Sequence, residues 1–351
     1  MTHTRTHSVA IVSTSINPTP EAYALWARQG TLFVAGDSNS PDELQRYVEE
    51  IGGVYLTPVK QTQLCFAVSN AIGWRCEQRR NMAVLKAYSE GYDFIVTVDD
   101  DNEPLTDDFV EEHVDILVHG DRNRILMATA RGGWVNPGTF GWPRVAQRGL
   151  PYYPEATWNA VEPGGYDHNV RPVVSQAIIT GSPDCDALYR LTHNPTVVGT
   201  LENVIVDPKC YAPFGSQATV WDGEWAPLIA CLPVIRRSQD IYASFIFQRI
   251  AREHNCGVRF GGPVAHQERN DHNPYRDLEA ELWGLEHTLE FTRALDETEL
   301  TGTTLWEQYH ELGEAVEKLE YVDRRVSNFM HEWSHAWAAH SRDRVRNRSE
   351  R

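Results

Sequence analysis

Residues 94–102 read FIVTVDDDN, an apolar and β-branched run followed directly by three aspartates. An uninterrupted run of this kind is typical of a strand that is buried on both faces of a sheet. The residues before it have the pattern of a helix over 77–90 that ends at Gly91. Further strand signals alternate with helix signals, the strands at 9–13, 31–35 and 54–57 and the helices at 20–29 and 41–51. This alternation predicts an α/β fold with a Rossmann-like, mostly parallel sheet flanked by helices.

Polar residues stand where three of the predicted strands end. The first strand ends in Ser13, Thr14 and Ser15, the second is followed by Asp37, and the fourth by the aspartates that begin at Asp99. In open α/β sheets, ligands bind beyond the carboxyl ends of the parallel strands. We therefore expect a site large enough for a nucleotide at this edge.

Three adjacent carboxylates at the end of a buried strand repel one another unless a counter-charge is present. Because side chains alternate along a strand, Asp99 and Asp101 are expected to point one way and Asp100 the other. A divalent cation on Asp101, with Asp99 holding metal-bound water or a ribose, would relieve the repulsion. Oxygen ligands favour Mg²⁺ or Mn²⁺. The alternative is a solvated acidic turn ahead of a helix.

Two further motifs flank this run. Arg79 and Arg80 open the helix before it, where guanidinium groups would bind a diphosphate in bidentate fashion. Asp240 opens a later predicted helix over 239–254, which is followed by a strand at 258–261 and by His266. An acid at a helix start is usually a cap. The order of all these motifs is more specific than any one of them.

In this order of motifs, the chain resembles the glycosyltransferase-A superfamily. More closely, it resembles the reversibly glycosylated polypeptide (UDP-arabinopyranose mutase) family and the STELLO-type glycosyltransferases, over residues 8–285. The segments that carry the resemblance are 98–101, 183–187 (PDCDA), 211–217 (YAPFGSQ), 239–242 (QDIY), His266 with 273–275 (NPY), 189–192 (YRLT), and Gly36-Asp37 near Pro41.

The resemblance implies a glycosyltransferase that takes a sugar from a nucleoside diphosphate sugar, with UDP-sugar as the expected donor, and that needs Mn²⁺ or Mg²⁺. It makes Asp99, Asp101 and His266 the metal ligands, with His272 as a competitor of His266. Asp240 would contact the acceptor or the donor sugar. The expected donor contacts are Ser13, Thr14, Ser15, Asp37, Arg79, Arg80, Asp99, Asp100, Asp184 and Asp186.

Chemically related alternatives stay open. In the mutases, an arginine in the helix before the aspartate run becomes glycosylated. Arg80 is the nearest match, although the surrounding segment 75–81 departs from that motif. If the transfer inverts configuration, Asp240 is the candidate base; if it retains configuration, Asp240 positions the sugar. A nucleotidyltransferase would show a Gly-rich, basic loop after the first strand, and residues 13–17 lack one.

The chain divides into a predicted catalytic domain, 1–285, and a C-terminal helical extension, 286–351. The catalytic domain has a nucleotide-binding half over about 8–130 and an acceptor half over 131–285. Segment 131–171 is irregular and aromatic, which indicates an acceptor-binding loop or a small satellite core. Apolar residues over 305–337 recur at three- and four-residue spacing. They predict one amphipathic helix, or two with a break near Tyr321, which packs back on the catalytic domain or forms a homodimer contact.

The composition limits the class of partner. The 351 residues include 32 Lys and Arg against 49 Asp and Glu, for a net charge of −17, which argues against a nucleic-acid partner. No apolar run approaches the roughly 20 residues of a membrane span, and no apolar leader precedes residue 9. Six scattered cysteines indicate reduced thiols, so we expect a cytoplasmic protein.

One motif points to a different chemistry. His331 and His335 form a literal HExxH with Glu332, which on a helix would place both imidazoles on one face for zinc and offers a remote metalloprotease alternative. No third histidine follows at the spacing of the extended motif. Trp333 and Trp337, which interleave with it, have the spacing of packing residues.

Overall fold

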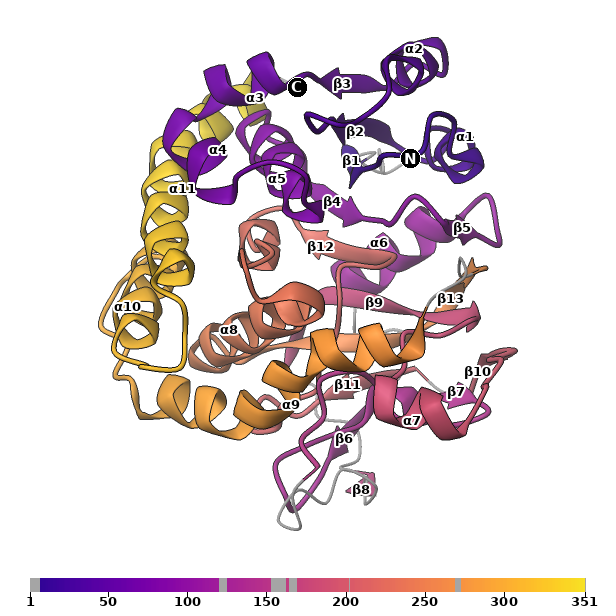
Figure 1. Cartoon of the computed structure of the whole chain (residues 1–351), viewed down its shortest axis with the longest axis vertical. Coiled ribbons are helices and arrows are strands. Elements are labelled where there is room, and N and C mark those ends of the chain that lie inside the picture. Colours follow the sequence, from indigo (N-terminus) through magenta and orange to yellow (C-terminus); the bar gives the residue numbers. More distant parts are fainter. Residues whose placement is uncertain are drawn as a thin grey trace, which may run out of the picture.

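The computed structural model describes residues 7–119, 125–152, 162–163, 169–201, 203–268 and 273–350. In these residues one large mixed sheet crosses the molecule (Figure 1). Its strands lie in the order β3 (Val54–Leu56), β2 (Thr31–Ala35), β1 (Val9–Thr14), β4 (Phe94–Thr97), β12 (Thr219–Asp222), β9 (Arg171–Gly181), β13 (Cys256–Gln267), β11 (Val204–Val206), β6 (Leu126–Thr129) and β8 (Glu162–Pro163). The short β5 (Asn102–Pro104) pairs with β13, and β7 (Gly141–Trp142) pairs with β10 (Gly199–Thr200) in a separate ribbon.

The first four strands of the chain are parallel, in the spatial order β3-β2-β1-β4. Their carboxyl ends therefore share one edge of the sheet. Beyond β4, the strand β12 runs antiparallel to both β4 and β9, and β9 then pairs parallel with β13. The α/β fold predicted from the sequence is confirmed, with four adjacent parallel strands in the N-terminal half.

Helices cover both faces of the sheet. They are α1 (Glu21–Trp26), α2 (Asp42–Glu50), α3 (Pro58–Leu64), α4 (Phe66–Ile72), α5 (Arg80–Ser89), α6 (Phe109–His119), α7 (Ala187–Thr192), α8 (Gln239–Glu253), α9 (Pro274–Glu297), α10 (Leu305–Glu317) and α11 (Arg324–Glu350). Because successive side chains of a strand point to opposite faces of the sheet, the core has two parts, one on each face. In β1, Ala10 and Val12 pack on the side of α5 and α8, whereas Ile11 packs with α1, α2 and α6.

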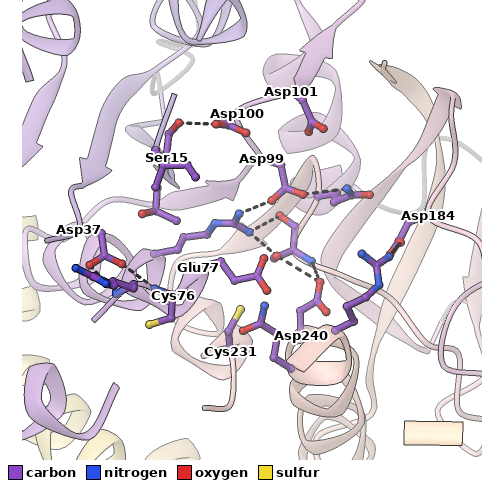
Figure 2. A pocket seen from close by; sticks show the side chains of 18 of the residues that line it. Ser15, Asp37, Cys76, Glu77, Asp99, Asp100, Asp101, Asp184, Cys231 and Asp240 are labelled. Atoms are coloured by element: carbon purple, nitrogen blue, oxygen red, sulfur yellow. Dashed lines mark hydrogen bonds and ion pairs between the residues drawn. The ribbon is translucent and has the colours of Figure 1, made fainter. Parts of the chain in front are cut away.

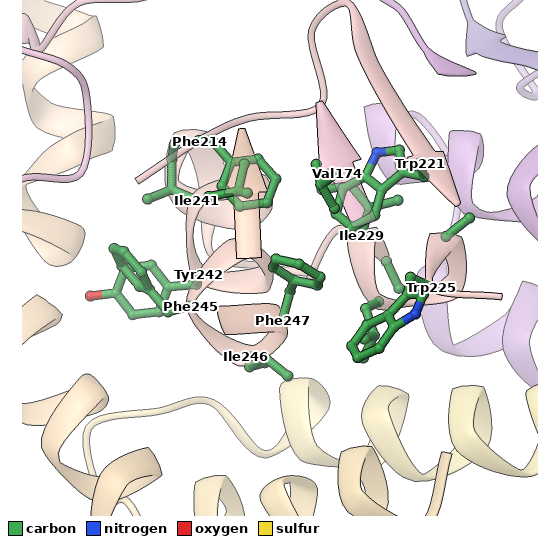
Figure 3. Close-up of a cluster of buried hydrophobic side chains, with 14 of the residues drawn as sticks. Val174, Phe214, Trp221, Trp225, Ile229, Ile241, Tyr242, Phe245, Ile246 and Phe247 are labelled. Carbon is green, nitrogen blue, oxygen red and sulfur yellow. The ribbon is translucent and has the colours of Figure 1, made fainter. Parts of the chain in front are cut away.

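A cluster of aromatic rings fixes α8 against the centre of the sheet (Figure 3). Phe247 of α8 meets Trp221 of β12 edge to face at 5.3 Å and Phe214 at 5.7 Å between ring centroids. All three side chains are buried. Because such rings fill a core densely, they hold the first turn of α8 in one position at the edge of the sheet.

The C-terminal residues form two helices, α10 and α11, with a break that contains Tyr321. This confirms the two-helix alternative. The seam faces inward: Trp337 is fully buried and packs against Tyr88 of α5, and the indole nitrogen of Trp333 donates a hydrogen bond to Pro227 at 2.9 Å. The hairpin therefore packs back on the sheet domain, and α11 runs along α4 and α5 (Figure 1).

Close approach of α11 depends on Gly91, the residue that ends the helix before β4. Its φ is +83°, and a Cβ there would lie 2.8 Å from the backbone nitrogen of Arg348. The buried Arg344 donates a hydrogen bond to the carbonyl of Tyr92 at 2.9 Å in the same turn. The glycine thus both stops α5 and admits the last turns of α11.

Several other predicted segments differ from the structure in where they begin or end. The helix expected over 77–90 begins with a 3₁₀ turn, Glu77–Arg79, and continues as α5. Helix α9 runs across the predicted domain boundary at 285. In the aromatic segment, Trp134 and Phe140 are buried core residues, whereas Trp142 is 57% exposed. Residues 153–161 and 164–168 of that segment lie outside the described part of the chain.

No helix among the described residues is both long and apolar enough to cross a membrane. All six cysteines are free thiols.

We predict that Trp337→Ala lowers the free energy of unfolding by about 3–5 kcal/mol, since it empties a fully buried site between three helices. Val345→Ala is the control. Val345 lies on the same helix and is 72% exposed, so the expected change in the free energy of unfolding is within about 0.5 kcal/mol. Urea unfolding followed by tryptophan fluorescence measures both. Equal losses in the two variants would show that α11 is not part of the cooperative core.

Candidate active site

A cavity of about 390 Å³ opens at the carboxyl ends of β1, β2 and β4. It is strongly acidic, with seven carboxyl groups against four guanidinium groups. The lining residues are Thr14, Ser15, Ile16, Asp37, Asn39, Arg75, Cys76, Glu77, Arg80, Asp99, Asp100, Asp101, Arg148, Asp184, Ser216, Gln217, Cys231, Arg237, Gln239, Asp240 and Gln267. The structure therefore brings together most of the residues that the sequence singled out.

One end of the cavity is formed by the turns that follow β1 and β2. Thr14 donates a hydrogen bond to the carbonyl of Ala35 at 2.6 Å, which ties the two strand ends together. The carboxylate of Asp37 accepts hydrogen bonds from two backbone groups, the N–H of Arg75 at 2.8 Å and the N–H of Cys76 at 2.7 Å. Asp37 therefore fixes the loop that leads into α5.

The three aspartates after β4 are held by different partners. Asp99 accepts from Arg80 and, at 2.9 Å, from the amide of Gln217. Asp100 accepts from the hydroxyl of Ser15. Asp101 accepts from the amide of Gln267 at 2.9 Å. Only Asp99 is in an ion pair, so two of the three carboxylates have neutral partners alone in the described part of the chain.

The two carboxyls that have no ion-pair partner among the described residues hold their protons more strongly than an ordinary aspartate. Burial raises the pKa of Asp101 to about 6, and the charges of Asp99 and Asp100 add to the shift. Burial also raises the pKa of Asp100. Carboxyls in this state attract a proton or a cation.

Arg80 lies at the centre of the site. Its guanidinium donates to Asp99 and to the hydroxyl of Ser216. Burial alone would lower the pKa of Arg80, but the adjacent Asp99 carboxylate raises it above its usual value, so the side chain stays charged. It holds the end of β4 to the turn before β12.

The opposite end of the cavity is built around Arg148. Its guanidinium meets Asp184 in a bidentate pair, with Nε donating to Oδ1 at 3.1 Å and Nη2 to Oδ2 at 2.7 Å, and it contacts Asp240 at 3.2 Å. Burial opposes the charge, yet Asp184 and Asp240 raise the pKa of Arg148 well above its ordinary value. No periodicity or motif in the sequence points to Arg148, because it lies in the irregular segment after residue 131.

Asp240 also accepts a hydrogen bond from the backbone N–H of Ser216 at 3.1 Å. That approach requires Gly215, where a Cβ would lie 2.7 Å from Oδ2 of Asp240. The aromatic cluster packs α8, the helix that carries Asp240 in its first turn, against the sheet (Figure 3). Asp240 is therefore held rigidly at the cavity wall.

Three expected donor contacts lie outside the cavity lining. Ser13 is fully buried and donates to the carbonyl of Val98 at 2.8 Å, because strand alternation turns it away from Thr14. Arg79 is fully buried, and its guanidinium donates to the carbonyl of Ser69 at 3.0 Å. Asp186 caps α7 through the N–H of Leu188 at 2.8 Å. These three side chains are structural in this arrangement.

Asp101 accepts a hydrogen bond from Gln267, the residue next to the expected metal ligand His266. His266 and Gln267 alternate along β13, and Gln267 takes the side that faces the aspartates. The Nδ1 atom of His266 lies 3.2 Å from the hydroxyl of Thr180. His266 lines a neighbouring open cavity, which it shares with Asp100 and Asp101. The competing ligand, His272, lies outside the described residues.

Across residues 7–119, 125–152, 162–163, 169–201, 203–268 and 273–350, no group of three or more His, Cys, Asp and Glu side chains is arranged to hold a metal ion. The donor chemistry nevertheless fits Mg²⁺ or Mn²⁺. Asp100 and Asp101 offer carboxylate oxygens that have no cationic partner among the described residues, and Mg²⁺ commonly takes one or two carboxylates together with substrate phosphates and water.

The HExxH histidines stand against α10. Nδ1 of His331 lies 3.3 Å from Nδ1 of His310, and Nε2 of His331 lies 3.6 Å from Glu317. The interleaved Trp333 and Trp337 are fully buried. The motif therefore belongs to the hairpin of α10 and α11, and it is distant in sequence from the residues that line the acidic cavity.

No protein-family model matches the sequence, and no curated protein matches it. Two solved structures resemble the chain in arrangement, each at 10% sequence identity and a TM-score of 0.43. One is glucosyl-3-phosphoglycerate synthase from Mycobacterium tuberculosis in complex with Mn²⁺ and UDP-glucose, matched over 81% of this chain and 79% of that chain. The other is mannosyl-3-phosphoglycerate synthase from Rubrobacter xylanophilus, matched over 85% and 79%. At these values, the chemistry of the cavity has to be judged from its own contacts.

We predict that Arg148→Ala lowers the free energy of unfolding by about 3–5 kcal/mol, because Asp184 and Asp240 then lose a buried partner. Arg171→Ala is the matched control: Arg171 is 58% exposed in its pair with Asp222, and its loss should cost about 1 kcal/mol or less. Chemical denaturation at neutral pH measures both variants. Similar values for the two would contradict the central role given to Arg148.

Proposed function

We propose that this protein is a glycosyltransferase of the glycosyltransferase-A type, which takes a sugar from a nucleoside diphosphate sugar with the help of Mn²⁺ or Mg²⁺. The observation that carries the proposal is the run Asp99-Asp100-Asp101 at the cavity, in which Asp100 and Asp101 lack a cationic partner among the described residues. An anionic diphosphate would enter so acidic a cavity only together with a divalent cation. Among nucleoside diphosphates, the family resemblance favours UDP.

In this proposal the residues of the chain divide the work by position. The turns after β1 and β2, with Thr14, Ser15 and the loop held by Asp37, would receive the nucleoside. Asp101, with Asp100 beside it, would hold the cation. A bound divalent cation would neutralise the charge that develops on the departing diphosphate.

Arg80 and Asp240 would act on the reacting groups themselves. Arg80 is charged and fixed, and its electrostatic field favours negative charge on a leaving diphosphate. Asp240 is connected to Arg80 through Ser216, whose hydroxyl contacts both, and its carboxylate is oriented by Arg148 and Ser216. In an inverting transfer Asp240 would accept the proton of the acceptor hydroxyl. The acceptor would then enter from the side of Asp184 and Arg237.

The first test is binding of UDP with and without Mn²⁺. We expect UDP at about 100 times its Kd to raise the unfolding free energy by about 2.7 kcal/mol, only when Mn²⁺ is present. Asp101→Ala should abolish this gain, whereas Asp107→Ala, at an exposed site outside the cavity, should keep it. Thermal shift with a nucleotide panel measures the effect. Equal UDP binding without metal, or in Asp101→Ala, would contradict the proposal.

A second measurement separates transfer from mutase chemistry. A transferase releases UDP from a UDP-sugar when water or an acceptor takes the sugar, whereas a mutase changes the ring form and keeps the nucleotide attached. We expect slow UDP release from UDP-glucose, detected by a coupled assay, and its loss in Asp240→Asn. Ring interconversion without UDP release would favour a mutase.

A further inference from the structure

At the end of the cavity proposed for the acceptor, the guanidinium groups that the structure describes are already paired with carboxylates. Figure 2 shows this end, with Asp184 and Asp240, on one side of the cavity and Asp37 with Cys76 on the other. Arg148 is paired with both Asp184 and Asp240. Its charge is therefore matched before any ligand enters.

Arg237 is the second guanidinium group at this end. It belongs to the 3₁₀ turn Arg236–Ser238 that precedes α8, and it lines the cavity. Its Nε atom donates to Glu281 at 2.9 Å, and its two Nη atoms lie 3.6 Å from Asp277 and 3.9 Å from Asp184. The two guanidinium groups thus face four carboxylates, so this end carries an excess of negative charge.

The carboxylates that hold Arg237 are fixed in place. Glu281 and Asp277 are both buried side chains of α9. One oxygen of Glu281 accepts from Arg237, and the other accepts from the backbone N–H of Ala187 at 2.9 Å, in the first turn of α7. An incoming anion would have to take Arg237 from these partners and leave a buried carboxylate without its cation, which is strongly unfavourable.

The other two guanidinium groups of the cavity do not change this balance. Arg80 is paired with Asp99 at the end of β4. Arg75 belongs to the loop that Asp37 holds, at the end proposed for the nucleoside. Among the residues that the structure describes, an anionic acceptor would thus meet carboxylates and no unpaired guanidinium at this end.

A buried oxygen at the same end lacks a hydrogen-bond donor. Gln239 precedes Asp240 at the start of α8, lines the cavity and is 5% exposed. Its side-chain oxygen has no hydrogen-bond partner among the described residues. An amide oxygen accepts hydrogen bonds and donates none, so it calls for a hydroxyl or amino group and repels a carboxylate or phosphate.

We propose that the acceptor is a hydroxyl-bearing molecule without phosphate or carboxylate groups: an uncharged sugar or polyol, or an amino derivative of one. This inference rests on the proposed function and adds to it the charge class of the acceptor. Two independent observations carry it, the paired state of Arg148 and Arg237 and the unpartnered oxygen of Gln239. The first disfavours an anion by charge, and the second calls for a hydrogen-bond donor.

The test compares probes that share one sugar ring and differ in charge. Glucose, glucosamine and glucose 6-phosphate are titrated into the full chain with UDP and Mg²⁺ at saturation, so that the diphosphate position is filled. Ligand-observed NMR measures binding. In the unchanged protein we expect glucose 6-phosphate to bind no more tightly than glucose or glucosamine. Tighter binding of glucose 6-phosphate would overturn the inference.

Two substitutions on α9 release the charge of Arg237. Glu281→Gln and Asp277→Asn each remove one negative charge and keep the shape of the side chain. Each should strengthen the binding of glucose 6-phosphate about tenfold, because one charge pair near the protein surface has at least the energy of this ratio. The affinity for glucose should change less than about twofold, since glucose carries no charge. Glu279→Gln, at an exposed site of the same helix, controls for the change in net charge and should leave all three affinities unchanged.

The variants decide the role of the ion pairs. A gain for glucose 6-phosphate in either Glu281→Gln or Asp277→Asn, absent from Glu279→Gln, supports the inference. If neither variant gains, or if Glu279→Gln gains as much, the paired state of Arg237 does not set the charge of the acceptor and the inference fails.

The failure of the two proposals can be told apart. Absence of metal-dependent UDP binding in the unchanged protein would overturn the proposed function and the acceptor class with it. Intact metal-dependent UDP binding, together with a preference of the unchanged protein for glucose 6-phosphate, would overturn the acceptor class alone.

Discussion

The ion pair between Arg80 and Asp99 is the contact on which the rest of the site depends. It joins the first turn of α5 to the end of β4, and the same guanidinium reaches Ser216 in the turn before β12. Three separate segments of the chain thus meet on one buried charge. Since a buried guanidinium needs its partners nearby, this contact fixes the relative positions of the aspartate run and of the wall that carries Asp240.

The arrangement leaves charge unevenly matched. Arg80 pairs with Asp99, and Arg148 pairs with Asp184 and Asp240, but Asp100 and Asp101 have only hydroxyl and amide partners among the described residues. The carboxylates of Asp100 and Asp101 are therefore available to bind a cation, whereas those of Asp184 and Asp240 already contact the guanidinium of Arg148. In the proposed function, this asymmetry would place the nucleotide and the cation at the ends of β1, β2 and β4 and the acceptor beyond Arg148.

The C-terminal helices support this site from a distance. Helix α11 packs along α4 and α5, the helices on either side of the loop that carries Arg75, Cys76 and Glu77. Trp337 buries its ring against Tyr88, and Gly91 lets the last turns of α11 approach. The apolar seam that the sequence shows over 305–337 thus serves to hold α5, and through it Arg80, against the sheet.

The sequence by itself determined the alternation of strands and helices, the strand that ends at Asp99, and the gathering of Thr14, Ser15, Asp37 and the aspartates at one edge. These follow from local periodicity and from the rule that parallel strands end together. Only the tertiary structure decided that Gln267 rather than His266 faces Asp101, that Arg79 is structural, and that Arg148 and Glu77 line the cavity. The reason is physical: which side of β13 meets the aspartates depends on pairing and bulges between distant strands, and Arg148 lies in a segment without periodicity.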